Sequence, residues 1–315
     1  MKIRQRSEEG RKTKKDVIKK SIRAAGRKLK LWLVPLLVRF SPVLATQLIY
    51  LANNGKLLNL KDPKNYHDKF HWLKLYWRNP LVVKCADKYE VRAFIEERHC
   101  KEILNELYGV YANTKEIDWN LLPDKFVLKT TNASSTNIIC RNKGTLDKQD
   151  TLKKLDKWLK LDYGLKHAEI FYSQMTPRII CEKYIETEDG LVPNDYKVYC
   201  FNGNPKFILA ISGRDTGNPR MQTFDLNWNE LDYVKKECQG NLDIKLREPR
   251  TLEQMVYYAQ KLSEGFPYVR VDLYDVRGSV IFGEMTFAPA AGYKTIFNEE
   301  AVNLMGRWIE LPDRG

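Results

Sequence analysis

Beyond Pro123 the chain consists of short apolar runs separated by turn signals, and this pattern restricts the possible folds more than any other feature. The clearest runs are Lys125–Lys129, Asn137–Cys140, Arg178–Glu182, Asp195–Phe201, Lys206–Ser212, Val269–Tyr274 and Val280–Glu284. Turn sequences at Asn202–Pro205 and Arg277–Ser279 join neighbouring runs as hairpins, so the strands should be mostly antiparallel. Helical patterns over Leu146–Leu161 and Leu252–Glu264 lie between them. The sequence therefore predicts an α+β protein, without a Gly-x-Gly-x-x-Gly or Walker motif.

The part of the chain before Pro123 is predicted to be largely helical. His67 and His71 are four residues apart on one helical face, a spacing that could chelate zinc. No third ligand accompanies them, which favours a structural role. We expect three segments: a basic arm with an apolar, membrane-proximal stretch (1–58), an N-terminal helical or α+β lobe (59–122) and a main domain (123–315). The main domain should divide at about residue 185 into two lobes, 123–185 and 186–315.

The positive charge of the chain is concentrated at its start. The sequence holds 53 Lys and Arg against 40 Asp and Glu, a net charge of +13. Residues 1–30 contain thirteen of these basic residues and three acidic ones, which leaves 40 basic and 37 acidic residues in the rest. Because the body is nearly neutral, no broad basic face for nucleic acid is expected.

An apolar stretch, Leu31–Leu51, follows the basic arm. Arg39 and two prolines interrupt it, which argues against a membrane-spanning helix and against a secretory signal. Two interpretations remain open. The stretch can be a helix packed on the body, with the cationic arm in solvent. Alternatively, residues 1–51 lie on a membrane surface, where the basic residues attract anionic lipid and Trp32, Leu33 and Phe40 insert shallowly.

Six cysteines are scattered through the chain without a Cys-x-x-Cys pair. Cys181 and Cys200 lie within apolar runs, which favours buried thiols in a reducing compartment over disulfides or a zinc site. The expected location is therefore the cytoplasm. The membrane-surface interpretation of residues 1–51 adds peripheral attachment to the inner face of the cell membrane.

The last predicted hairpin carries the strongest chemical signal. Strand alternation puts Arg270, Asp272 and Tyr274 on one face, and it puts Glu284 and Thr286 on one face of the partner strand. Asp272 and Glu284 should then lie near each other, and two such carboxylates repel unless a cation lies between them. They could simply be solvated, but an arginine beside them is a natural partner for phosphate. Carboxylate and phosphate oxygens are what Mg²⁺ prefers.

Several sequence segments together resemble the TupA-like ATP-grasp family, from about Asn59 to Pro312 and in order along the chain. The segments are Trp72–Tyr76, Ala86–Lys88 with Arg92, Phe126–Lys129, Asp195–Gly203, Val269–Tyr274, Phe282–Phe287 and Gly306–Pro312. The resemblance implies an ATP-grasp fold, with mostly antiparallel sheets and helices preceded by a helical N-terminal region. It also implies ATP and Mg²⁺ as cofactors.

The same resemblance implies roles for individual residues. Arg270 and Lys197 would be catalytic, and Asp272, Glu284 and Thr286 would hold the metal. The residues implied to contact ATP are Lys88, Lys129, Ser134, Ser135, Glu182, Lys183, Tyr184, Ile185, Glu188 and Asp195. Among them the two lysines Lys88 and Lys129 would bind phosphates, the segment 182–185 would meet adenine, and Glu188 or Glu186 would bind the ribose.

Two positions depart from the family pattern. The loop Thr130–Thr136, which would fold over the phosphates, contains no glycine and so lacks the usual freedom to adopt positive φ. Its serine hydroxyls can still donate to phosphate oxygens. Thr286 stands where many ATP-grasp enzymes have asparagine, a change that TupA-like proteins share.

The activity that the resemblance implies is amide formation between a carboxylate and an amine through an acylphosphate. The expected substrates are an amino acid and the uronic acid of a bacterial surface-glycan precursor, in capsule or cell-surface polysaccharide synthesis. A glycosyltransferase is one alternative, although the sequence has no Asp-x-Asp motif. A non-catalytic protein that binds a nucleotide or glycan is another, and the glycine-free loop favours it.

Overall fold

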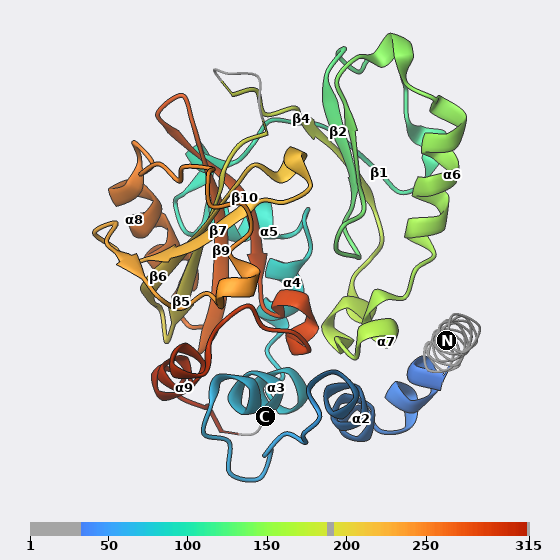
Figure 1. Cartoon of the computed structure of the whole chain (residues 1–315). Helices are drawn as coiled ribbons and strands as arrows, with labels where there is room; N and C mark the ends of the chain where they lie inside the picture. Colours follow the sequence, from blue (N-terminus) through green and yellow to red (C-terminus); the bar gives the residue numbers. More distant parts are fainter. Residues whose placement is uncertain (1–32, 188–191, 314–315) are drawn as a thin grey trace, which may run out of the picture.

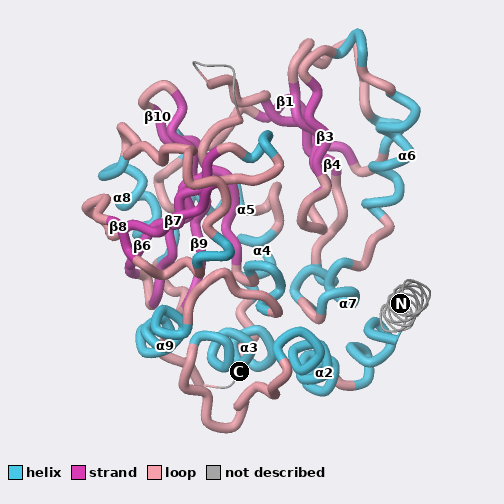
Figure 2. The backbone as a smooth tube through the Cα atoms, in the orientation of Figure 1, coloured by secondary structure: helices cyan, strands magenta, loops and turns pink. Residues whose placement is uncertain are grey.

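The computed structural model describes residues 33–187 and 192–313. Two antiparallel sheets stand side by side, and helices close one end of the molecule (Figure 1). Figure 2 shows the same division, with the strands gathered into two groups and the helices around them. The α+β class with mostly antiparallel strands is therefore confirmed.

The smaller sheet has four strands in the order β1-β4-β2-β3. Its strands are β1 (Leu107–Tyr111), β2 (Phe126–Thr130), β3 (Asn137–Cys140) and β4 (Ile179–Lys183). Helix α6 (Lys148–Leu159) covers its outer side, and Leu155 packs there against Phe126 and Leu128. Asp147 begins this helix by accepting a hydrogen bond from the backbone N–H of Asp150 at 2.9 Å, which satisfies a donor of the first turn.

The larger sheet has six strands in the order β10-β9-β5-β6-β7-β8. Its strands are β5 (Asp195–Phe201), β6 (Asn204–Ser212), β7 (Arg220–Phe224), β8 (Glu230–Leu231), β9 (Tyr268–Val276) and β10 (Ser279–Thr286). Helix α8 (Leu252–Ser263) packs on its outer face, where Met255 and Leu262 meet Val269 and Val271. The other face of β5 and β9 carries the polar side chains Lys197, Arg270 and Asp272.

A bulge at Gly283 sets the register of the β9–β10 hairpin. Phe282 pairs with Leu273, but Glu284 pairs with Asp272, so one residue is skipped. Without the bulge Glu284 would lie on the opposite face from Asp272, because side chains alternate along a strand. A Cβ at position 283 would approach the Asp272 carbonyl oxygen and the Tyr274 ring to 3.0 Å, so glycine suits the bulge.

The remaining helices lie mainly around the large sheet and at one end of the molecule (Figure 1). They are α2 (Pro42–Asn54), α3 (Tyr66–Tyr76), α4 (Pro80–Ala86), α5 (Val91–Glu97), α7 (Tyr163–His167) and α9 (Glu299–Trp308), and residues 33–40 are also helical. Helix α3 begins at Asn65, whose side chain accepts from two backbone N–H groups, and packs against α9. Among the described residues, no helix is both long and apolar enough to cross a membrane.

Residues of the expected lobe 59–122 associate with both sheets. Strand β1 pairs with β4 and is therefore part of the small sheet. Helices α4 and α5 instead belong to the core of the large sheet, where Phe94 and Ile95 are buried. The sequence could not show this, because β1 and β4 are separated by more than sixty residues.

Residues that the sequence marked as possible metal ligands are structural here. His71 lies within hydrogen-bonding distance of the Gly292 carbonyl oxygen, with its Nε2 3.0 Å away, and both His67 and His71 are buried among aromatic rings. The cysteines are unpaired, and five of the six are buried, as expected for small apolar side chains; Cys238 is partly exposed.

Candidate functional site

A cavity of about 660 Å³ lies between the two sheets, a size typical of a cofactor site. From the small sheet and its loops it is lined by Val127, Lys129, Ser134, Ser135, Glu182, Tyr184 and Ile185, and from the segment between α4 and α5 by Lys88. From the large sheet it is lined by Asp195, Lys197, Tyr199, Arg214, Arg270, Asp272 and Glu284. The cavity thus brings together residues that are up to about two hundred positions apart.

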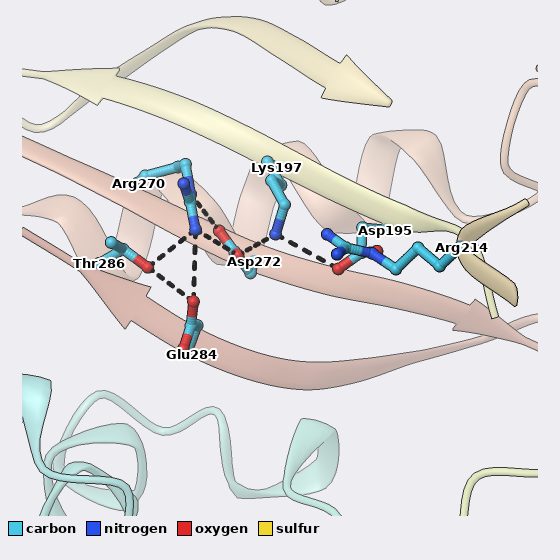
Figure 3. Close-up of polar contacts among 7 residues, drawn as sticks. All are labelled: Asp195, Lys197, Arg214, Arg270, Asp272, Glu284 and Thr286. Carbon is cyan, nitrogen blue, oxygen red and sulfur yellow. Dashed lines mark hydrogen bonds and ion pairs between the residues drawn. The ribbon is translucent and has the colours of Figure 1, made fainter. Parts of the chain in front are cut away.

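Arg270 is the centre of the polar network on the large sheet (Figure 3). Its guanidinium donates two hydrogen bonds to Asp272, at 2.6 and 2.7 Å, in the bidentate geometry that suits a carboxylate. It also donates to Thr286 at 3.0 Å and to Glu284 at 3.3 Å. Thr286 in turn donates to Glu284 at 3.0 Å. The hairpin therefore holds one arginine, two carboxylates and one hydroxyl on a single face.

Strand β5 extends this network. Lys197 lies opposite Asp272 in the ladder, and its ammonium donates to that carboxylate and, at 3.3 Å, to Asp195. Arg214 donates to the other oxygen of Asp195. Arg214 was not among the predicted residues. Counting back from the β5–β6 turn would not have placed it correctly, because the register shifts between Tyr199 and Cys200. Asp195 therefore lies opposite Ile211, three residues before the arginine.

The charges of this network balance and are largely withdrawn from water. Asp272 has only 3% of its side chain exposed. Burial alone would raise the pKa of Asp272, but Arg270 and Lys197 outweigh it and hold the pKa below its ordinary value. Burial likewise opposes the charge of Arg270, and Asp272 overcomes it, so the pKa of Arg270 is raised. Glu284 differs, because 43% of its side chain is exposed.

The small sheet and the adjoining α4–α5 segment present more basic than acidic side chains to this region. Lys129 and Arg92 share the carboxylate of Glu182, at 2.6 and 3.5 Å. Lys88 donates to two backbone carbonyls of the loop after β2, those of Thr130 and Ala133. Burial lowers the pKa of Lys88 from its ordinary value, and the charge of Glu284 opposes this shift.

The segment predicted to meet adenine borders the cavity along its length, since Glu182, Lys183, Tyr184 and Ile185 all line it. Lys183 also pairs with Glu106 at 3.0 Å, with 57% of the lysine side chain exposed. Glu188 lies outside the described residues.

The glycine-free loop after β2 adopts a defined conformation. Ser135 has φ of +59°, in the left-handed region that usually favours glycine. The loop is held at its base by a 2.8 Å hydrogen bond from the Thr130 hydroxyl to the Thr136 hydroxyl. Asn132 donates to the carbonyls of Trp158 and Leu161 at 3.2 and 3.1 Å, which ties the loop to the end of α6. Ser134 and Ser135 remain exposed towards the cavity.

The donor set suits Mg²⁺ bound together with phosphate oxygens. No cluster of three or more His, Cys, Asp or Glu that could hold a metal occurs within 33–187 and 192–313. Asp272 and Glu284 instead provide the one or two carboxylates with which Mg²⁺ is usually held when phosphates supply further ligands. Thr286, between Glu284 and Arg270, adds a hydroxyl oxygen.

Solved structures with similar folds share little sequence with this chain. A D-alanine–D-alanine ligase from Bacillus anthracis, in complex with ATP, is 14% identical with a TM-score of 0.38; the match covers 65% of this chain and 54% of the ligase, about half its length. The Helicobacter pylori ligase is 14% identical (TM-score 0.43; 78% and 67% covered). The D-cycloserine synthetase DcsG is 13% identical (TM-score 0.40; 72% and 70% covered). No curated protein matches the chain.

A family model gives the decisive comparison. The model described as TupA-like ATPgrasp matches residues 68–310, about three quarters of the sequence. The match includes both sheets and every cavity-lining residue discussed above. It confirms the resemblance seen in the sequence and, with it, the ATP-grasp fold. The chain belongs to the TupA-like ATPgrasp family.

Proposed function

We propose that the protein is an ATP-dependent carboxylate–amine ligase that uses Mg²⁺. The observation that carries the proposal is the Arg270–Asp272–Glu284 network, which faces the cations Lys88 and Lys129 across one cavity. Two carboxylates on one side and an excess of cations on the other complement a metal-bound polyphosphate. Family membership supports the same assignment.

The reaction would proceed in two steps. A carboxylate oxygen of the first substrate attacks the γ-phosphorus of ATP, the bond to the β-phosphate oxygen breaks, and ADP leaves. The amine of the second substrate then attacks the acyl carbon. The bond from this carbon to the bridging oxygen breaks, inorganic phosphate leaves with that oxygen, and the amine loses a proton to give the amide. Arg270 and Lys197 are placed to stabilise negative charge on the transferring group and the acylphosphate.

The nucleotide would lie with its phosphates between the two sheets. Lys129, Lys88 and the hydroxyls of Ser134 and Ser135 would hold the phosphates, and the segment 182–185 would contact adenine through Glu182, Lys183, Tyr184 and Ile185. Asp272, Glu284 and Thr286 would hold Mg²⁺, which neutralises phosphate charge when bound. Asp195 accepts a hydrogen bond from Lys197 and would keep that lysine oriented towards the reacting group.

For the substrates, the family suggests an amino acid and the uronic-acid carboxylate of a surface-glycan precursor, in bacterial capsule or polysaccharide synthesis. The proposed place of action is the cytoplasmic side, at the inner face of the cell membrane, reached through residues 1–51. Charge supports this location, because thirteen basic residues lie within residues 1–30.

ADP release tests the proposal directly. The purified chain is incubated with ATP, Mg²⁺, a set of uronic acids and a set of amino acids, and ADP is measured with and without each component. Hydroxylamine, added in place of the amine, should trap the acylphosphate as a hydroxamate. ADP release that needs a carboxylate and Mg²⁺ supports the ligase, whereas turnover of a sugar nucleotide without ATP would refute it.

A further inference from the structure

The N-terminal helices expose a stripe of large apolar side chains. The stripe consists of Leu33, Leu36, Phe40, Leu44, Leu48 and Leu51, each between 40% and 82% exposed. Successive members are three or four residues apart, so within each helix they lie on one face. Scattered apolar residues are ordinary on a surface, but a continuous stripe marks an interaction site.

The opposite face of the same helices is firmly packed. Val34, Val38 and Ala45 are buried against Ala168, which follows α7. Tyr50 is buried and stacks edge-on against His71. The stripe is therefore not the unpacked side of a loose segment; the helices are held in place and present it outwards.

The sequence around the stripe is cationic throughout. Between Asp16 and Asp62 the sequence contains nine Lys and Arg residues and no Asp or Glu. Two copies of the chain meeting at this stripe would bring these like charges together. An anionic lipid surface instead attracts them. Charge thus selects lipid over a second copy as the occupant.

We infer that the stripe from Leu33 to Leu51 docks the protein on an anionic bilayer. The two helices would lie in the interface with the stripe inserted among the acyl chains, and they would not span the membrane. Phe40, the most exposed member, would insert most deeply. Arg39 and Lys56, both exposed, would lie beside the lipid phosphates.

This surface is connected to the catalytic end of the cavity. The Asn54 side chain donates to the Tyr293 carbonyl at 3.1 Å, and this tyrosine directly follows the turn Pro289–Gly292, which lines the cavity. Figure 1 places α2 below α7, at the end of the molecule away from the β10 hairpin turn. If the proposed function holds, on which this consequence rests, the bilayer would deliver a lipid-borne substrate to that end.

Vesicle binding tests the surface separately from catalysis. The full chain is sedimented, without ATP, with vesicles of equal parts phosphatidylcholine and phosphatidylglycerol, and with vesicles of phosphatidylcholine alone. We expect binding to the anionic vesicles that weakens at high salt, because screening reduces the attraction of the basic residues. Phe40→Ser should reduce the partition coefficient about tenfold, since it removes one large inserted side chain.

Leu121→Ser is the matched control, because Leu121 is 81% exposed and Phe40 is 82% exposed, and only Phe40 belongs to the stripe. Equal binding by wild type and Phe40→Ser, or an equal loss in both variants, would overturn the inference. So would a dimer in solution that Phe40→Ser dissociates while no vesicle binding is seen, since the stripe would then be a contact between copies. Absence of ADP release with intact vesicle binding would refute the ligase but leave the surface standing.

Discussion

The two sides of the cavity handle charge in opposite ways. On the large sheet, Asp195, Asp272 and Glu284 are matched by Lys197, Arg214 and Arg270 in one connected network. On the opposite side, Lys129 and Arg92 share the single carboxylate of Glu182, and Lys88 donates only to backbone carbonyls. The charges on the large-sheet side therefore balance one another before any cation or anion binds. The opposite side carries an excess of positive charge.

This difference explains how one cavity can take a metal and a polyphosphate at once. Phosphates entering along Lys129 and Lys88 meet uncompensated positive charge. Mg²⁺ entering beside Glu284 meets a carboxylate that is partly exposed and only weakly engaged, with Arg270 3.3 Å away. Asp272 is buried and fully engaged, so it fixes the geometry, whereas Glu284 can exchange its partner. The two carboxylates should therefore respond differently to mutation.

Asp272→Asn should have the largest effect of any single change. It removes the buried negative charge shared by Arg270 and Lys197, so these cations keep only their longer carboxylate contacts, with Glu284 and Asp195. We expect ADP release to fall by about 10²–10³-fold and the free energy of unfolding to fall by about 3–5 kcal/mol. Steady-state ADP release and urea unfolding measure the two effects.

Asp275→Asn provides the control for that change. Asp275 lies on the same strand, three residues further, and its side chain accepts from the backbone N–H of Arg250. ADP release should stay within about twofold, since surface substitutions away from the site change little. Equal loss in both variants would mean that the balanced network on β9 has no special role.

Glu284→Gln should separate catalysis from stability. The side chain is 43% exposed and its contact with Arg270 is long, so the free energy of unfolding should change by less than about 0.5 kcal/mol. ADP release should nevertheless fall by about 10²-fold, with a higher Mg²⁺ concentration needed for half-maximal rate. Glu97→Gln, another exposed paired glutamate, is the control and should leave both quantities unchanged. A stability loss as large as that of Asp272→Asn would remove the proposed distinction.

Lys129→Met tests the cationic side of the cavity. Losing a charge-assisted contact to phosphate is worth about 1.5–3 kcal/mol, so the KM for ATP should rise by about 10–100-fold. The maximal rate should fall less, because Lys129 lies on the opposite sheet from the Arg270 network. Lys154→Met on α6, whose lysine pairs with Asp150 in solvent, is the control. An unchanged KM would contradict phosphate binding by this side.

The stability that Asp272 contributes should depend on pH. Its pKa in the folded protein lies below the ordinary value, because Arg270 and Lys197 outweigh the effect of burial. A depressed folded pKa stabilises the protein above the unfolded pKa of about 3.9, and this contribution is lost as the pH falls further. The difference in unfolding free energy between wild type and Asp272→Asn should therefore be largest near neutrality and shrink below about pH 4. A difference that does not vary with pH would contradict the ionised state.

Sequence predicted the features that depend on neighbouring residues. The β9–β10 hairpin carries its own turn, so alternation and turn position were enough to group Arg270, Asp272 and Glu284, although the bulge at Gly283 that puts Glu284 on the shared face was not foreseen. Two contacts required long-range information. The pairing of Lys197 with Asp272 joins strands about seventy residues apart, and the pairing of β1 with β4 joins strands of different predicted segments. Nothing local specifies which distant strands become neighbours.

The smallest predicted effect concerns the loop that lacks glycine. Ser135 adopts φ of +59°, a conformation that costs a residue with a side chain about 1 kcal/mol or more and costs glycine little. Ser135→Gly should therefore raise the free energy of unfolding by about 0.5–1 kcal/mol in urea titrations. Ser134→Gly is the matched control, because Ser134 does not have a positive φ, and it should destabilise the protein slightly. If both variants lose stability equally, the loop gains nothing from glycine, and its hydroxyls are retained for a reason other than backbone geometry. If only Ser135→Gly gains stability while the KM for ATP rises, the Ser135 hydroxyl binds phosphate at the expense of backbone strain.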